Sequence, residues 1–158
     1  MKHLTKMALA AGVLAVATTA LAQPKPEQFV KQRQSALALI GWYFGPMGAV
    51  AKGEAPFNKE DAIRRTTNLV ALSKMPWEGF VGGTESVGNT KALPAIWSKP
   101  AEFKKAGDNM QAEMVKLAAL ATAGHKGGFK KQFGAVGGTC KACHDDFRKQ
   151  EQLQVFLP

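Results

Sequence analysis

The chain has 158 residues, 46% of them hydrophobic and 21% charged, with 21 Lys and Arg against 12 Asp and Glu. This length allows one domain with a sizeable core and leaves little room for a second. The basic residues are scattered and form no single tract. The charge therefore indicates solvated helix faces and argues against a nucleic-acid-binding protein, with a preference for anionic partners as a secondary interpretation.

The first 22 residues have the pattern of an export signal. Lys2 and Lys6 give a basic start, an apolar run follows, and "ALA" at 20–22 offers small residues to a signal peptidase. A membrane anchor is the alternative, but the run is short for a bilayer span. We expect residues 1–22 to be removed, which leaves 23–158 as one periplasmic domain without a membrane anchor. That domain has 19 basic and 12 acidic residues, a net charge of +7.

Helical periodicity dominates the rest of the chain, and strand-type alternation is nearly absent. Three helices are expected before the cysteines: residues 26–52, a second from Asn58 as N-cap to just before Pro76, and a third from Ser98 as N-cap to Gly124. Gly45 and Pro46 lie inside the first of these helices and should kink it or end its regular part.

A fourth helix contains the chain's two cysteines. Its apolar positions follow a spacing of 4, 3, 4, 3 and 4 residues: Phe129, Phe133, Val136, Cys140, Cys143 and Phe147. This seam places both cysteines on the core side of the helix. Together the four helices predict an all-α, antiparallel up-down-up-down four-helix bundle.

The connection at 75–98 is long for such a bundle and carries several aromatic residues. It joins the second and third helices at the end of the bundle where the fourth helix finishes. Its Trp77 and Phe80 are therefore expected to shield whatever the cysteines hold.

The motif C-x-x-C-H is formed by Cys140, Cys143 and His144, and three kinds of site could use these residue types. A redox disulfide would place its reactive thiol at a helix N-terminus in a βαβ setting, which this sequence does not offer. A structural zinc site needs four ligands, and His125 lies 19 residues before His144. Covalent haem c fits best, because thiols at i and i+3 can bond one porphyrin while His144 ligates the iron.

With these motifs the whole of 23–158 resembles the cytochromes c′, the class II c-type cytochromes. The likeness includes "RQSAL" at 33–37, "MPWEGF" at 75–80, "GTE" at 83–85 and "CKACHDDFRK" at 140–149. The resemblance implies a five-coordinate, high-spin iron with an apolar distal side, binding of nitric oxide and carbon monoxide, and a homodimer. It also implies roles for individual residues: Leu37 on the distal side, Arg33 and Gln34 near the haem propionates, Thr84 and Glu85 along the haem edge, and Arg148 on the proximal side.

Two functions remain open at this stage, and neither is enzymatic. A low-spin branch of the same family supplies a methionine as sixth ligand from the position that Leu37 matches, and it transfers electrons. Met75, at the end of the second helix, is the methionine that could take this role here, whereas Met47 lies too far along the first helix. The leading prediction is a gas-binding haem protein; the alternative is a six-coordinate carrier that meets an acidic redox partner.

Overall fold

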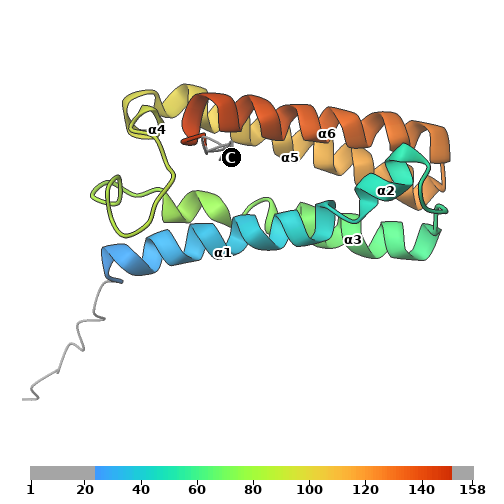
Figure 1. Cartoon of the computed structure of the whole chain (residues 1–158), viewed down its shortest axis with the longest axis horizontal. Coiled ribbons are helices and arrows are strands. Elements are labelled where there is room, and N and C mark those ends of the chain that lie inside the picture. The colour runs from blue at the N-terminus through green and yellow to red at the C-terminus, as the bar shows by residue number, and fades with distance from the viewer. Residues whose placement is uncertain (1–23, 151–158) are drawn as a thin grey trace, which may run out of the picture.

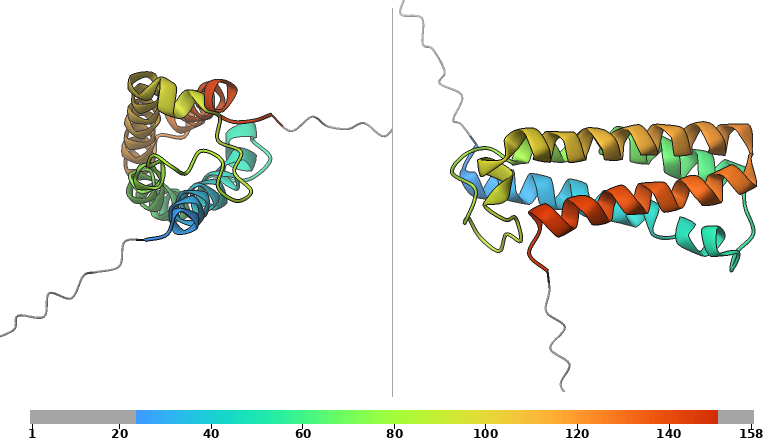
Figure 2. Two further views of the ribbon diagram at one scale, coloured as in Figure 1. Left: turned by 90° about the vertical axis from the view of Figure 1, so that its left-hand side faces the viewer. Right: turned by 90° about the horizontal axis from the view of Figure 1, so that it is seen from above.

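The computed structural model describes residues 24–150, so the predicted export signal and the tail at 151–158 lie outside the described residues. The four long helices of the bundle are α1 (Pro26–Phe44), α3 (Lys59–Leu72), α5 (Pro100–Ala123) and α6 (Lys126–Phe147). In Figure 1 they lie along the horizontal long axis with alternating chain direction, and they occupy four corners when viewed along the bundle axis in Figure 2. The predicted four-helix bundle is thereby confirmed. None of the helices within 24–150 is both long and apolar enough to cross a bilayer.

The expected first helix is interrupted. α1 ends at Phe44, and a separate short helix, α2 (Met47–Lys52), follows and packs against α6. Pro46 has no N–H to bond back into α1, and it becomes the N-cap of α2. The single helix expected over 26–52 is thus wrong, and its break falls at the proline that the sequence marks.

Two of the three predicted helix caps are confirmed. The Asn58 side chain accepts a hydrogen bond of 2.9 Å from the Asp61 N–H, and Gly124 ends α5 in the left-handed conformation at φ 69°. Ser98 was expected to cap α5, and this is wrong. It belongs to a preceding short helix, α4 (Ala95–Ser98), and Lys99 is the N-cap without a side-chain capping bond.

One apolar cluster fills the centre of the bundle. The Cys140 side chain is half-buried and packs against this cluster, as the seam of α6 predicts. The buried members are Ile40, Met47, Ala62, Leu69, Met110, Met114, Leu117, Ala121, Phe129 and Val136.

The long connection folds over one end of the bundle. It contains a 3-10 turn, η1 (Pro76–Gly79), and α4, so it is more regular than the sequence suggests. Residues 91–93, which we call the strap, pair with the chain just after α6. The Leu93 N–H donates to Phe147 O at 3.0 Å and the Lys149 N–H to Lys91 O at 2.8 Å. The strap thus fixes the end of α6 that carries the C-x-x-C-H motif.

Gly107 lets α5 approach the connection closely. A Cβ at this position would lie 2.6 Å from a ring carbon of Trp77. We expect Gly107→Ala to displace Trp77 and to lower the free energy of unfolding by about 1–3 kcal/mol. Gly134→Ala, where a Cβ meets nothing within 4 Å, should instead raise it by up to about 1 kcal/mol. Urea unfolding of the two variants tests this, and equal effects would contradict it.

Candidate haem-binding site

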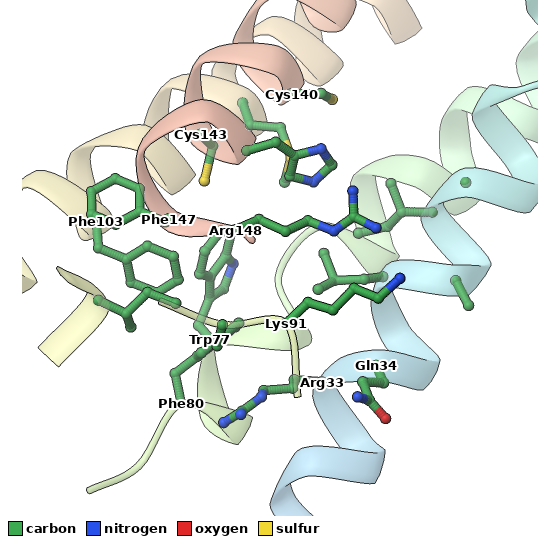
Figure 3. Close-up of a pocket in the computed structure, with 18 of the residues that line it drawn as sticks. Arg33, Gln34, Trp77, Phe80, Lys91, Phe103, Cys140, Cys143, Phe147 and Arg148 are labelled. Carbon is green, nitrogen blue, oxygen red and sulfur yellow. The ribbon is translucent and has the colours of Figure 1, made fainter. Parts of the chain in front are cut away.

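A cavity of about 790 Å³ opens between α1 and α6 at the strap end of the bundle. Cys140, Cys143 and His144 line it from α6, as Figure 3 shows for the two cysteines. The volume lies within the range of ~300–1,000 Å³ that is typical of cofactor pockets. The cavity therefore brings together the three residues of the motif in a space large enough for a porphyrin.

The Cys140 and Cys143 side chains line the cavity from one face of α6. Burial raises the pKa of Cys140, and burial together with Cys140 and Asp146 raises the pKa of Cys143 to about 11. Thiol redox sites depend on the opposite shift, since their reactive cysteine has a lowered pKa.

His144 follows Cys143 directly and completes the α6 wall. Burial lowers its pKa, the positive charge of Arg148 lowers it further, and Asp145 partly offsets this. A neutral imidazole with a free lone pair is the form that ligates a metal. His125 is far from this group: it caps the opposite end of α6, where its Nδ1 accepts a hydrogen bond of 2.8 Å from Gly128.

The wall facing His144 is formed by α1. Leu37, Ala38 and Gly41 line it, and none of them carries an atom that ligates iron. Leu37 lies at the cavity surface, is 38% exposed and is absent from the buried core.

Aromatic residues close the end of the cavity. Trp77 and Phe80 from the connection, Phe103 from α5 and Phe147 from α6 all line it. Phe103 lies edge-on to both Phe80 and Phe147, with ring centroids 4.9 and 5.2 Å apart. The sequence placed Trp77 and Phe80 at this end, and the structure adds two residues of the helix seams.

Arg33 is buried at 2% exposure beside the cavity, and its guanidinium joins α1 to the connection. One terminal nitrogen donates to Gly79 O at 2.8 Å and to Thr84 Oγ1 at 2.7 Å. The other donates to Thr84 O at 3.1 Å and to Thr90 Oγ1 at 2.9 Å. The guanidinium carbon also lies 4.7 Å from the centre of the Phe80 ring. Burial lowers the pKa of Arg33, and the charge of Glu85 partly opposes this.

Thr84 and Glu85, expected along the haem edge, belong to the connection beside the cavity. Thr84 and Glu85 do not line the cavity. Thr84 is buried at 1% exposure against Arg33, while Glu85 accepts a hydrogen bond from the N–H of Gly83 in its own turn. Both residues shape the connection, and their contact with the cofactor stays a prediction.

Gln34, Lys91 and Arg148 line the side of the cavity where the strap meets α1. Figure 3 shows Lys91 and Arg148 extending from the strap and the end of α6 toward α1. Gln34 donates to Asn89 O at 2.9 Å, which ties α1 to the residues just before the strap. Lys91 was missed by sequence reasoning, because only the pairing of the strap with residues 147–149 brings it to the site.

The methionines divide differently from the sequence expectation. Met75 is 46% exposed and does not line the cavity, so the structure does not support it as an iron ligand. Met47 is buried away from the cavity, as expected. Met110 is buried in the core and also borders the cavity.

A family model described as Cytochrome C' matches residues 28–148. The chain is 44% identical over 127 residues to a cytochrome c' of Alcaligenes xylosoxydans xylosoxydans, covering 80% of this chain and 98% of that protein. It is 40% identical over 126 residues to one of Rubrivivax gelatinosus, with 80% and 98% covered. Among solved structures, the nitric oxide complex of a mutant of cytochrome c prime from Alcaligenes xylosoxidans superposes with a TM-score of 0.76 at 42% identity, over 82% of this chain and 100% of that one.

The fold and the site define a c-type haem protein built as a four-helix bundle. This chain belongs to the cytochrome c′ family, and the haem c predicted from its motif is the covalent cofactor of that family. The residues present fit the group, because the cavity offers two thiols, an imidazole and an apolar interior.

Arg33 provides a test of how the connection is held. In Arg33→Met the carbonyl of Gly79 and the polar atoms of Thr84 and Thr90 lose a charged donor, so unfolding should become easier by about 2–4 kcal/mol. Amide exchange across 79–90 should also accelerate. Arg64→Met is the matched control, since its side chain is 56% exposed and its ion pair with Asp61 should contribute less than about 1 kcal/mol. Equal losses of unfolding free energy in urea for the two holoproteins would contradict a larger contribution from the buried hydrogen bonds of Arg33.

Proposed function

We propose that this chain is a haem protein that binds nitric oxide and carbon monoxide at a five-coordinate, high-spin iron. The observation that carries the proposal is the α1 wall opposite His144, where Leu37, Ala38 and Gly41 offer no iron ligand. An apolar distal wall gives no hydrogen bond to bound oxygen or water and so favours uncharged gases. A mutant of the related protein from Alcaligenes xylosoxidans has been solved as a nitric oxide complex, which supports the same ligand here.

When bound, haem supplies an iron that can coordinate a diatomic ligand, and the chain supplies everything around it. Cys140 and Cys143 would hold the porphyrin through thioethers, and His144 would ligate the iron. The aromatic residues at the end of the cavity exclude water from the porphyrin. These roles fit a carrier or sink of gas; we do not assign an enzymatic reaction.

Lys91 and Arg148 are proposed to bind the carboxylates of the haem. Both are basic and both line the strap side of the cavity, where charge-assisted hydrogen bonds to a carboxylate can form. Arg33 was expected near the propionates, but both of its terminal nitrogens are used in binding the connection. We therefore assign Arg33 mainly to positioning and keep Gln34 as a polar neighbour of the carboxylates.

Export and self-association complete the proposal. Removal of residues 1–22 would place the protein in the periplasm, where haem c proteins of this family are expected. A homodimer is supported by two large apolar side chains on the outer surface of α1, Leu39 at 46% and Trp42 at 73% exposure. Sedimentation velocity over a range of protein concentrations tests whether the chain associates.

Electron transfer is the second candidate function, and Met110 favours it. Its thioether borders the cavity, so it is the methionine that a six-coordinate, low-spin iron would recruit within residues 24–150. The net charge of +7 after processing would then guide encounter with an acidic partner. Met110 comes from α5, which packs directly against α6, whereas the wall facing His144 belongs to α1. Met110 therefore does not belong to the wall that faces His144, and this favours an iron without a sixth protein ligand over the electron-transfer alternative.

Titration of the ferrous holoprotein with nitric oxide and carbon monoxide, followed by optical absorption, tests the proposal. We expect a broad Soret band without sharp α and β bands, which shifts as each gas binds. Met110→Leu should give the same spectra. A sharp spectrum that does not respond to the gases, and that broadens in Met110→Leu, would establish the electron-transfer alternative.

Leu37→Met tests the geometry of the α1 wall. This substitution places a thioether opposite His144 with little change in side-chain volume, so we expect the iron to become six-coordinate and low-spin. Carbon monoxide affinity should fall by at least about tenfold, because the gas must then displace a ligand. Leu39→Met, on the outer surface of α1, is the control and should behave as the wild type. Unchanged spectra for Leu37→Met would mean that α1 does not face the iron.

A further inference from the structure

Two glycines inside helices border the cavity although the fold does not require them. Gly41 lies in α1 and Gly137 in α6, and a Cβ at either would meet nothing within 4 Å. Glycine inside a helix is less favourable than alanine. At Gly79 and Gly107 the protein packs tightly against the missing side chain, which explains glycine there. At Gly41 and Gly137 an added Cβ would instead occupy open space that borders the cavity.

Gly41 lies on the wall that faces the iron's open side. It is one turn after Leu37 and three residues before Phe44, and all three line the cavity from α1. A helical side chain leans toward the N-terminus and covers the turn before its own Cα. A side chain at position 41 would therefore cover the backbone beside Leu37. Its absence leaves a recess in the cavity wall between Leu37 and Phe44.

The recess ends at a rigid boundary. Phe44 stacks on Phe133 of α6, with ring centroids 4.2 Å apart and ring planes within 7° of parallel. This contact joins α1 to α6 beyond the cavity, so the two helices cannot readily move apart there. The recess therefore has Leu37 on one side and a fixed aromatic pair on the other.

We propose that Gly41 is a specificity-determining residue of the gas site. The recess gives a bound ligand room beside Leu37, so that a ligand enters without displacing that side chain. Its size sets the largest uncharged ligand that the site accepts and the rate at which small ligands bind. This inference rests on the proposed function, because it assumes an iron that is open toward α1.

The test compares two ligands of different size on the ferrous holoprotein, carbon monoxide and n-butyl isocyanide. Gly41→Ala should lower the affinity for the isocyanide by about tenfold and change that for carbon monoxide by less than about threefold, as expected when one methyl group crowds a fitted site. Gly41→Val should lower the affinity for both ligands. Leu37→Ala in the Gly41→Val background should restore carbon monoxide binding, because the lost space is returned next to position 41.

Gly138→Ala is the matched control. Gly138 is also inside a helix, its added Cβ meets nothing within 4 Å, and it does not line the cavity. Both alanine variants should raise the midpoint of thermal unfolding to a similar extent, since both remove a helical glycine. Only the variants at position 41 should change ligand selectivity.

The outcomes separate this inference from the proposed function. A wild type that binds neither ligand refutes the proposed function and, with it, the inference. A wild type that binds both, with Gly41→Val binding them equally well, refutes the inference alone. An altered absorption spectrum of ligand-free Gly41→Ala would also refute it, because the recess would then accommodate the porphyrin and not the gas.

Discussion

The buried guanidinium of Arg33 joins the first helix to the connection that closes the haem end of the bundle. Its four hydrogen bonds reach η1 and two threonines, and its face contacts Phe80. A four-helix bundle normally fills its interior with side chains, but this one must keep a large cavity open between α1 and α6. The connection can form a wall of that cavity only if it is held in place. The Arg33 guanidinium holds it strongly, because both of its terminal nitrogens donate two hydrogen bonds each.

The strap provides the second attachment. It pairs residues 91–93 with the chain after α6 and so fixes Phe147 and the preceding turn that holds His144. Together the two attachments hold the cofactor residues in place while the α1 wall stays apolar. The α6 wall thus carries the thiols and the imidazole, and the facing residues Leu37, Ala38 and Gly41 of α1 are apolar. That asymmetry is the physical basis of the proposed selectivity for uncharged gases.

The fold and the cofactor residues could be predicted from the sequence because their signals are local. The seam that ends at Cys140, Cys143 and Phe147 marks one face of one helix, and Asn58 and Gly124 act through their own turns. Other features of the site depend on contacts between residues far apart in the chain. Thr84 matches a family position near the haem, and its hydroxyl accepts a hydrogen bond from Arg33, 51 residues away in the sequence. Lys91 reaches the site only through the strap. Ser98 had the composition of a cap, but α4 extends through it.

The central claim is that the iron is open on the side that faces α1. Electron paramagnetic resonance of the ferric wild-type holoprotein at neutral pH tests it directly, without any added gas. The account predicts a high-spin signal, because no side chain of the α1 wall can complete the coordination. A low-spin signal that becomes high-spin in Met110→Leu would contradict it, since the sixth position would then be occupied by a residue of α5.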